Sequence, residues 1–351
     1  MIKNPRRANM DRKMRIIRKS ELGAGSSLAY GWTMWLAIGF ASAGAPEVRA
    51  ASCNGDTLLG SGFETMERAD IAQSGPFQVA TVSGTSTRAA RSTPWTASYP
   101  VGTSQRPLVI FEPGYHVTSA AYADWAHHLT SWGYIVIRAE GPSDFFPDHV
   151  AVALDLQKVL TDLLVPGALP VSVASTRIAM SGHALGGKLA LMASASDARV
   201  KTMLVFDPSN ANNGSYSVQV PNIVPQPVAD IAKPLGILGE TLDSGPGLNS
   251  CSPAAQNYQT IFQAAISARP AYEWTLGGAG IASFISNPDA CGQSCSLCTQ
   301  PTLSLAQAQT FMLSSSTAFL ETHLNDSVGM CGWLTGSLLS PFVTLRMSNP
   351  N

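Results

Sequence analysis

The chain has 351 residues, of which 45% are hydrophobic and only 13% are charged, and its formal net charge at pH 7 is −1. This composition supplies enough apolar material for a large buried core and differs from that of disordered chains. The sequence contains no low-complexity block, no heptad pattern and no repeat of solenoid period, which excludes fibrous and repeat architectures.

The first 50 residues have the pattern of an export signal. Eight Lys or Arg lie between Lys3 and Lys19, an apolar stretch spans residues 28–45, and small residues lead up to Ala50. Basic, apolar and small-residue segments in this order are typical of a secretory signal peptide. We therefore expect residues 1–50 to be a signal peptide cleaved after Ala50, and the mature protein to be secreted or periplasmic.

Two alternatives stay open for this segment. It could remain as an anchor, although the apolar run is barely long enough to span a bilayer. A lipoprotein signal at Cys53 is weak, because Ala50 stands where leucine is usual. Removal of residues 1–50 leaves 13 basic and 20 acidic residues, a net charge of −7. No basic patch survives, so we expect no nucleic-acid partner. Because cleavage would remove the apolar segment with the signal peptide, we also expect no transmembrane anchor in the mature chain.

All six cysteines follow the expected cleavage point. An even count in an exported chain predicts up to three disulfides, with a connectivity that the sequence does not give. Three of them form C-x3-C-x2-C, a spacing that also holds iron–sulfur clusters, but disulfides suit an exported loop better, and a zinc site lacks an evident fourth ligand. We therefore expect no metal and no cofactor. The candidate disulfide residues are Cys53, Cys251, Cys291, Cys295, Cys298 and Cys331.

The first half of the mature chain alternates strand-like and helix-like segments. Residues 77–100 are expected to form an antiparallel sheet edge. Residues 106–114 read as a buried strand, because they are continuously apolar until Pro113-Gly114 stops them. A helix over 119–133, a strand over 134–141 and a helix over 148–165 come next.

The second half continues the alternation. Strands separated by helices imply a mainly parallel sheet covered on both faces, that is, an α/β fold. No linker divides the chain, so we expect residues 51–351 to form a single domain. The expected strands are 176–180, 200–208, 233–240 and 271–276, and the expected helices are 185–196 and 304–324.

The segment "SGHALGGKLA", residues 181–190, joins an expected strand to an expected helix. A strand, a sharp glycine-flanked turn and a helix form the context of the nucleophile elbow G-x-S-x-G. Gly182, Gly186 and Gly187 are in place. Ala184 stands where the serine nucleophile is expected, and the chain has no second G-x-S-x-G.

From about residue 75 to 325 the chain resembles a secreted α/β-hydrolase of the chlorophyllase and dienelactone-hydrolase-like group, to which cutinase-type polyester hydrolases are related. The segment "VIFEPGYHVTSAAYADWAHHLTSWGYIVI" resembles the strand, oxyanion loop, helix and next strand of the group, and "GHALGGKLAL" resembles its elbow. "LVFDPSN" resembles the chlorophyllase segment that carries the triad aspartate. "LGILGETLD" and "CSPAAQNYQTIF" resemble the next strand of the group and its Cys-x-Pro segment before a short helix. The resemblance implies an α/β-hydrolase fold and carboxylic-ester chemistry.

The resemblance also implies site residues. The oxyanion-hole amides are those of Tyr115 and Leu185, and His116 and His183 are expected to line the cleft. The triad acid carried over is Asp207.

Asp243 is the alternative acid, because many α/β-hydrolases place the acid after the next strand, and Glu240 is a weaker third candidate. The histidine position falls on Ile281, and none of the six histidines lies there. His323 is expected to be an exposed helical residue.

Three functions are compatible with these residues. The first is a secreted pseudoenzyme, a monomer that binds a hydrophobic ester-like small molecule or polymer end, since both Ser and His of the triad are replaced. The second is an active ester, lipid or polyester hydrolase whose triad is relocated or mis-recorded. The third is a structural or partner-binding domain with a closed cleft.

Overall fold

The chain divides into two units, Met1–Glu47 and Val48–Asn351, and all the described residues belong to the second. The segment expected to be a signal peptide lies outside them. None of the described helices is both long and apolar enough to cross a membrane. The computed structural model describes residues 53, 68–141, 144–210, 216–244, 251–291, 297–336 and 338–348.

One sheet of nine strands forms the centre of the described unit, in the order β1-β2-β4-β3-β5-β6-β7-β8-β9. Strands β4, β3, β5, β6, β7 and β8 pair in parallel, whereas β1 and β2 at one edge and β9 at the other pair antiparallel. The strands are β1 (Val79–Arg88), β2 (Arg91–Pro100), β3 (Gln105–Glu112), β4 (Ile135–Ala139), β5 (Ser172–His183), β6 (Thr202–Phe206), β7 (Leu235–Glu240), β8 (Ala271–Leu276) and β9 (Val343–Ser348).

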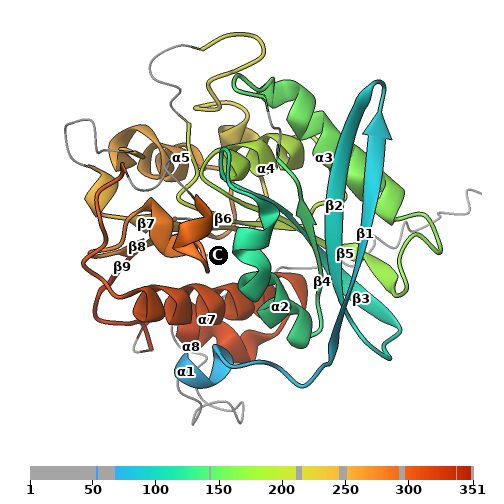
Figure 1. Ribbon diagram of the computed structural model, residues 1–351. Helices are drawn as coiled ribbons and strands as arrows, with labels where there is room; N and C mark the ends of the chain where they lie inside the picture. Colours follow the sequence, from blue (N-terminus) through green and yellow to red (C-terminus); the bar gives the residue numbers. More distant parts are fainter. Residues whose placement is uncertain are drawn as a thin grey trace, which may run out of the picture. The chain divides into compact units, whose positions relative to one another are not determined.

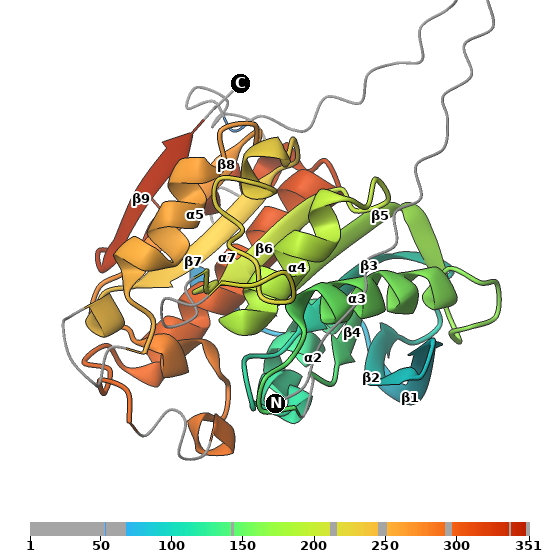
Figure 2. The same ribbon diagram turned by 90° about the horizontal axis from the view of Figure 1, so that it is seen from above.

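Helices cover both faces of this sheet, as Figures 1 and 2 show. Helices α3, α4 and α5 pack on one face, and α2, α7 and α8 on the other, so that two apolar cores are buried, one on each side. Strands β4 and β6 are buried along their whole length because both faces of the sheet are covered there. The helices are α1 (Arg68–Ile71), α2 (Ala123–Ser131), α3 (His149–Leu163), α4 (Leu185–Ala195), α5 (Tyr258–Ala264), α7 (Leu305–Leu324) and α8 (Cys331–Leu334).

Short 3-10 helices complete the loops. Two of them, η1 ahead of α2 and η5 after β8, lie in segments that shape the candidate site. The 3-10 helices are η1 (Ser119–Tyr122), η2 (Val228–Asp230), η3 (Leu242–Ser244), η4 (Ala254–Gln256), η5 (Ile281–Phe284), η6 (Pro288–Cys291) and η7 (Val328–Met330).

The predicted α/β-hydrolase architecture is confirmed: the sheet is mostly parallel, is covered on both faces, and has an antiparallel hairpin at the edge expected over residues 77–100. Strand β9 has no counterpart among the expected strands. Because the parallel strands all end at one edge, the loops after β3, β5, β6, β7 and β8 gather there. These loops, with the strand and helix ends beside them, carry every residue that the sequence assigned to the triad and the oxyanion hole.

Candidate active site

The turn between β5 and α4 has the geometry of a nucleophile elbow. Ala184, at its apex, adopts φ 49° and ψ −117°, a conformation that residues with a Cβ rarely take. The flanking glycines are required by close packing. A Cβ at Gly182 would lie 2.4 Å from the Gly186 carbonyl carbon, and one at Gly186 would lie 2.1 Å from the Glu112 carbonyl oxygen. The chain therefore keeps the elbow backbone although its apex is an alanine.

The nearest serine that precedes the elbow does not replace the missing nucleophile. Ser181, three residues earlier, is buried, and its hydroxyl donates to the Leu204 carbonyl oxygen of the neighbouring strand. It is held within the sheet rather than directed at a substrate. The methyl group of Ala184, which is 7% exposed, cannot attack a carbonyl.

The loop after β3, which is expected to supply an oxyanion-hole amide and is called the oxyanion loop below, is held by hydrogen bonds to buried side chains. The backbone N–H of Gly114 donates to the Tyr122 hydroxyl at 3.2 Å, and that hydroxyl lies 2.7 Å from Nδ1 of His183. Tyr115 projects outward, and its hydroxyl donates to the Phe145 carbonyl oxygen at 2.5 Å. Tyr115 and Leu185, the two residues expected to supply oxyanion-hole amides, line the same cavity.

His183, expected to line the cleft, is not among the residues that line this cavity. It is 1% exposed, beneath the oxyanion loop, and burial lowers its pKa to about 3, an effect that the Ile281 backbone only partly opposes. A neutral imidazole at physiological pH, held by Tyr122, acts here as a structural support for the loop. His116 does line the cavity, with a φ of 55° and its ring edge-on to Tyr115 at a centroid distance of 4.2 Å.

The position expected for the catalytic histidine lies after β8, where Ile281 begins η5. Its backbone N–H donates to Oδ2 of Asp243 at 2.7 Å. The other oxygen of Asp243 accepts from the backbone N–H of Thr299 at 3.3 Å. The structure thus brings together position 281 and the acid that follows β7.

Asp207 occupies a different place. It follows β6 directly, has a φ of 40° and is fully buried. Burial raises its pKa well above the usual range, and the charges on Glu240 and Asp243 add to the rise, while the Ser252 hydroxyl opposes it. Glu240 accepts from the Asp243 backbone N–H at 2.9 Å, and burial raises its pKa to about 7. The three candidate acids therefore form one buried cluster, in which Asp243 is the member bonded to residue 281.

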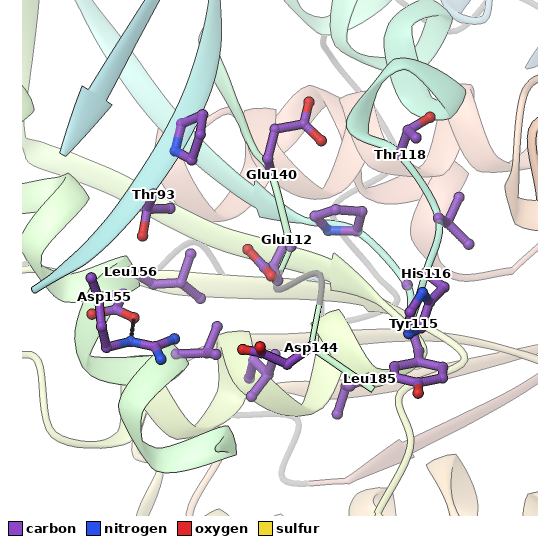
Figure 3. Close-up of a pocket in the computed structure, with 18 of the residues that line it drawn as sticks. Thr93, Glu112, Tyr115, His116, Thr118, Glu140, Asp144, Asp155, Leu156 and Leu185 are labelled. Carbon is purple, nitrogen blue, oxygen red and sulfur yellow. Dashed lines mark hydrogen bonds and ion pairs between the residues drawn. The ribbon is translucent and has the colours of Figure 1, made fainter. Parts of the chain in front are cut away.

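A cavity of about 690 Å³ opens beside the oxyanion loop, between the ends of β3 and β4 and the helices α3 and α4 (Figure 3). Ala184 is not among the residues that line it. Apolar walls come from Val152, Leu156, Leu185 and Leu189. Four acidic side chains also line the cavity. Sequence patterns did not identify these residues as part of a site, although a glutamate at the end of a mostly apolar strand could have pointed to one of them. The four acids are Glu112, Glu140, Asp144 and Asp155.

Residues 67–334 match the chlorophyllase family. The chain belongs to the chlorophyllase family. The match covers the elbow, the oxyanion loop, all three candidate acids and position 281, and it agrees with the mostly parallel sheet. A search among curated proteins finds no match.

In this chlorophyllase-family protein two further histidines are structural. The expectation that His323 is exposed is wrong: it is 5% exposed, its Nε2 lies 3.2 Å from the Tyr272 hydroxyl, and burial lowers its pKa to about 3. His128 is also buried, with Nε2 2.7 Å from the Thr317 hydroxyl. Neither is free to serve as a general base.

The described cysteines support the disulfide prediction. Cys53 is bonded to Cys331, and Cys251 to Cys298; Cys291 is disulfide-bonded as well, and Cys295 lies outside the described residues. Because Cys298 is committed to Cys251, the C-x3-C-x2-C spacing does not act as a three-cysteine cluster site. The Cys251–Cys298 bond lies beside Asp243 and Thr299 at the edge of the site.

Proposed function

We propose that this protein is an exported, catalytically impaired hydrolase that binds a hydrophobic ester-like ligand, either a small molecule or a polymer end. The observation that carries the proposal is an elbow with the conformation of an active hydrolase and no nucleophile at its apex, Ala184. Ile281 at the histidine position is a second, separate loss. Removing either partner of a serine hydrolase costs on the order of a millionfold in turnover, and removing both costs little more.

The cavity supports binding over the alternative of a closed cleft. About 690 Å³ of space lies against Tyr115 and Leu185, whose amides a family member would use to hold a carbonyl oxygen. An active hydrolase with a relocated triad is the second candidate. It is disfavoured by Ser181, whose hydroxyl is bonded into the sheet, and by His183, which is buried and neutral.

Export is part of the proposal. It is supported by the basic, apolar and small-residue order of residues 1–50 and by the disulfides, which persist in oxidising compartments. We propose cleavage after Ala50 and a monomeric mature protein. N-terminal sequencing of the exported form should begin at Ala51.

The test measures binding and turnover separately with p-nitrophenyl butyrate. We expect saturable binding by calorimetry and hydrolysis no faster than the buffer background. Leu185→Trp, which fills the cavity beside the expected amide, should weaken binding at least about tenfold. Val165→Trp, at a position that is 57% exposed, should leave it unchanged.

The other two functions predict different results. Enzyme-like turnover that a serine-directed phosphonate inhibits would establish the active hydrolase. Absence of binding by the folded protein to butyrate, hexanoate and decanoate esters would establish the closed cleft.

A further inference from the structure

Glu112 is a buried carboxyl group with no partner among the described residues. It ends β3, is 1% exposed, and neither of its side-chain oxygens has a hydrogen bond. Yet it lines the cavity rather than the core, and Figure 3 shows it among the other acidic side chains there. A buried polar group without a partner costs on the order of 1–3 kcal/mol, more if it is charged. The described part of the protein therefore offers these two oxygens no hydrogen-bond donor, and a bound molecule could supply one.

The neighbouring acids do not share this deficiency. Asp155 is neutralised by two arginines, since Arg88 and Arg91 reach its two oxygens at 2.7 and 2.5 Å. Glu140 accepts hydrogen bonds from the hydroxyl and the backbone N–H of Ser119. Donors of the protein thus meet these two carboxylates, and Asp144, the fourth acid of the cavity, is exposed to solvent. Glu112 is therefore the buried carboxyl group of the cavity that has no donor in the described part of the chain.

The surroundings of Glu112 are acidic. Burial raises its pKa to about 8, and the charges of Glu140 and Asp155 contribute to the rise. Asp144 also lines the cavity, and Arg91, which lines it too, is committed to Asp155. Tyr122, on the other face of the loop, stays un-ionised because burial raises its pKa. A cation is the ligand that this arrangement favours.

We propose that the cavity binds an organic molecule with a protonated primary amine, whose ammonium group donates to Glu112 and whose apolar part packs on Leu185 and Leu189. The proposal goes beyond the proposed function, because it does not require the ligand to have an ester carbonyl group bound at the elbow. An ammonium group has three N–H donors and matches the two empty oxygens of Glu112. A charge-assisted hydrogen bond of this kind is stronger than a neutral one.

The geometry favours an amine over a metal ion. Among the described residues, the only cluster of His, Cys, Asp or Glu close enough to chelate an ion is Asp243 with Cys251 and Cys298, and these cysteines form a disulfide. No three of the cavity carboxylates lie close enough together to form such a cluster. The space of about 690 Å³ and its apolar helix-facing wall suit an organic ligand.

Binding should be linked to proton release. Near neutral pH Glu112 carries a proton, and an arriving ammonium group favours its ionised form. The affinity should therefore rise as the pH increases from 6 to 8.5, a range in which an alkylamine stays protonated.

The test uses calorimetry of the mature protein with phenethylamine at pH 7, in two buffers with different heats of ionisation. We expect saturable binding with a heat that depends on the buffer in the sense of proton release. Trimethylphenethylammonium keeps the charge but has no N–H, and 3-phenylpropan-1-ol has no charge. Each should bind at least tenfold more weakly. Equal binding of either, or competition by Ca²⁺ at equal concentration, would overturn the proposal.

Glu112→Gln keeps the shape and removes the charge, so it should weaken phenethylamine binding at least tenfold and abolish the proton release. The control is Asp124→Asn, an exposed carboxyl on α2, on the other face of the sheet, which should change neither. A thermal melt verifies that both variants are folded. Undiminished affinity in folded Glu112→Gln would refute the proposal. Amine binding without ester binding would refute only the proposed function, and the reverse would refute only the amine site.

Discussion

Asp243 accepts a hydrogen bond from the backbone N–H of Ile281, with 2.7 Å between Oδ2 and the nitrogen. The residue at the position expected for the catalytic histidine is thus already hydrogen-bonded to a carboxylate through its backbone. In a serine hydrolase the acid orients the histidine and stabilises its cation. Asp207, the acid carried over from the chlorophyllase resemblance, is buried at the end of β6 and has no such contact with position 281 among the bonds described. We therefore propose Asp243 as the orienting acid of a restored triad.

Restoring both missing partners should restore hydrolysis. Ala184→Ser alone lacks a base, and Ile281→His alone lacks a nucleophile, so each single variant should stay near background on p-nitrophenyl butyrate. The double variant should be at least about a hundredfold faster, the lower range of general-base assistance. A stopped assay at pH 8 with folded, purified proteins measures this.

The choice of acid is tested in the double variant. Adding Asp243→Asn should abolish the gain, whereas adding Asp207→Asn should leave most of it. The opposite pattern would assign the role to Asp207. A folded but inert double variant would show that position 281 does not face the elbow.

Gly186 is predicted to tolerate no side chain. Alanine in a helix is normally better than glycine by up to about 1 kcal/mol. Here its Cβ would lie 2.1 Å from the Glu112 carbonyl oxygen and 2.3 Å from that of Pro113, both of them backbone atoms. Gly186→Ala should therefore destabilise the fold by at least about 2 kcal/mol in urea unfolding.

The matched substitution is Gly167→Ala, which has open space around its Cβ but a φ of 84°. It should cost only about 1 kcal/mol, the strain of a positive φ. Equal costs at the two glycines would mean that the oxyanion loop can move away from the elbow.

Sequence patterns located the sheet because its central strands contain short, mostly apolar runs and are separated by helices. Strand β8 was predicted at its observed bounds, 271–276. Strand β9 was missed, because an edge strand with half-exposed side chains on both faces has no apolar run to mark it. His323 was misplaced because α7 is buried on most of its surface and carries Ser and Thr inside, so its polar residues do not mark a solvent face.

Only those parts of the site that are formed by local sequence motifs could be predicted. The elbow and the oxyanion loop are local, and the glycines that shape them can be read from the chain. The choice between Asp207 and Asp243 is not local, because β6 and β7 end at the same edge of the sheet and both acids lie there. Whether the Glu112 carboxyl oxygens find a donor depends on how residues of β3, β4 and α3 are placed around them in the fold. No spacing in the sequence reveals this.

The Tyr122 hydroxyl should matter to stability because it serves two buried groups. It accepts from the Gly114 N–H at 3.2 Å and lies 2.7 Å from Nδ1 of His183. Tyr122→Phe leaves both without that partner and should cost about 1–3 kcal/mol in urea unfolding. Tyr99→Phe, on β2 and outside this network, should cost less than about 0.5 kcal/mol. A loss of unfolding free energy below about 0.5 kcal/mol for Tyr122→Phe would mean that water replaces the hydroxyl.

Glu112 should make the fold less stable as the pH rises. Its pKa is raised from 4.5 in the unfolded chain to about 8 in the folded protein, chiefly by burial. Between these values the folded state binds more protons than the unfolded state, so the free energy of unfolding falls with pH until the folded carboxyl ionises. Over this range the loss is on the order of 3–5 kcal/mol for one buried group.

Glu112→Gln removes this dependence, since the amide does not titrate. The variant need not be more stable at pH 5, where the wild-type carboxyl is protonated, but its stability relative to wild type should increase steadily up to about pH 8.5. Acids and histidines that are not coupled to the charge of Glu112 titrate alike in both proteins, so their contributions cancel in the difference. Only the carboxylates coupled to Glu112, those of Glu140 and Asp155, add to it. Urea unfolding of the two proteins at half-unit pH steps measures it, with Asp124→Asn as the reference for a lost surface charge. A difference that stays constant with pH would show that Glu112 is already ionised and paired in the folded protein, and that its oxygens are not vacant.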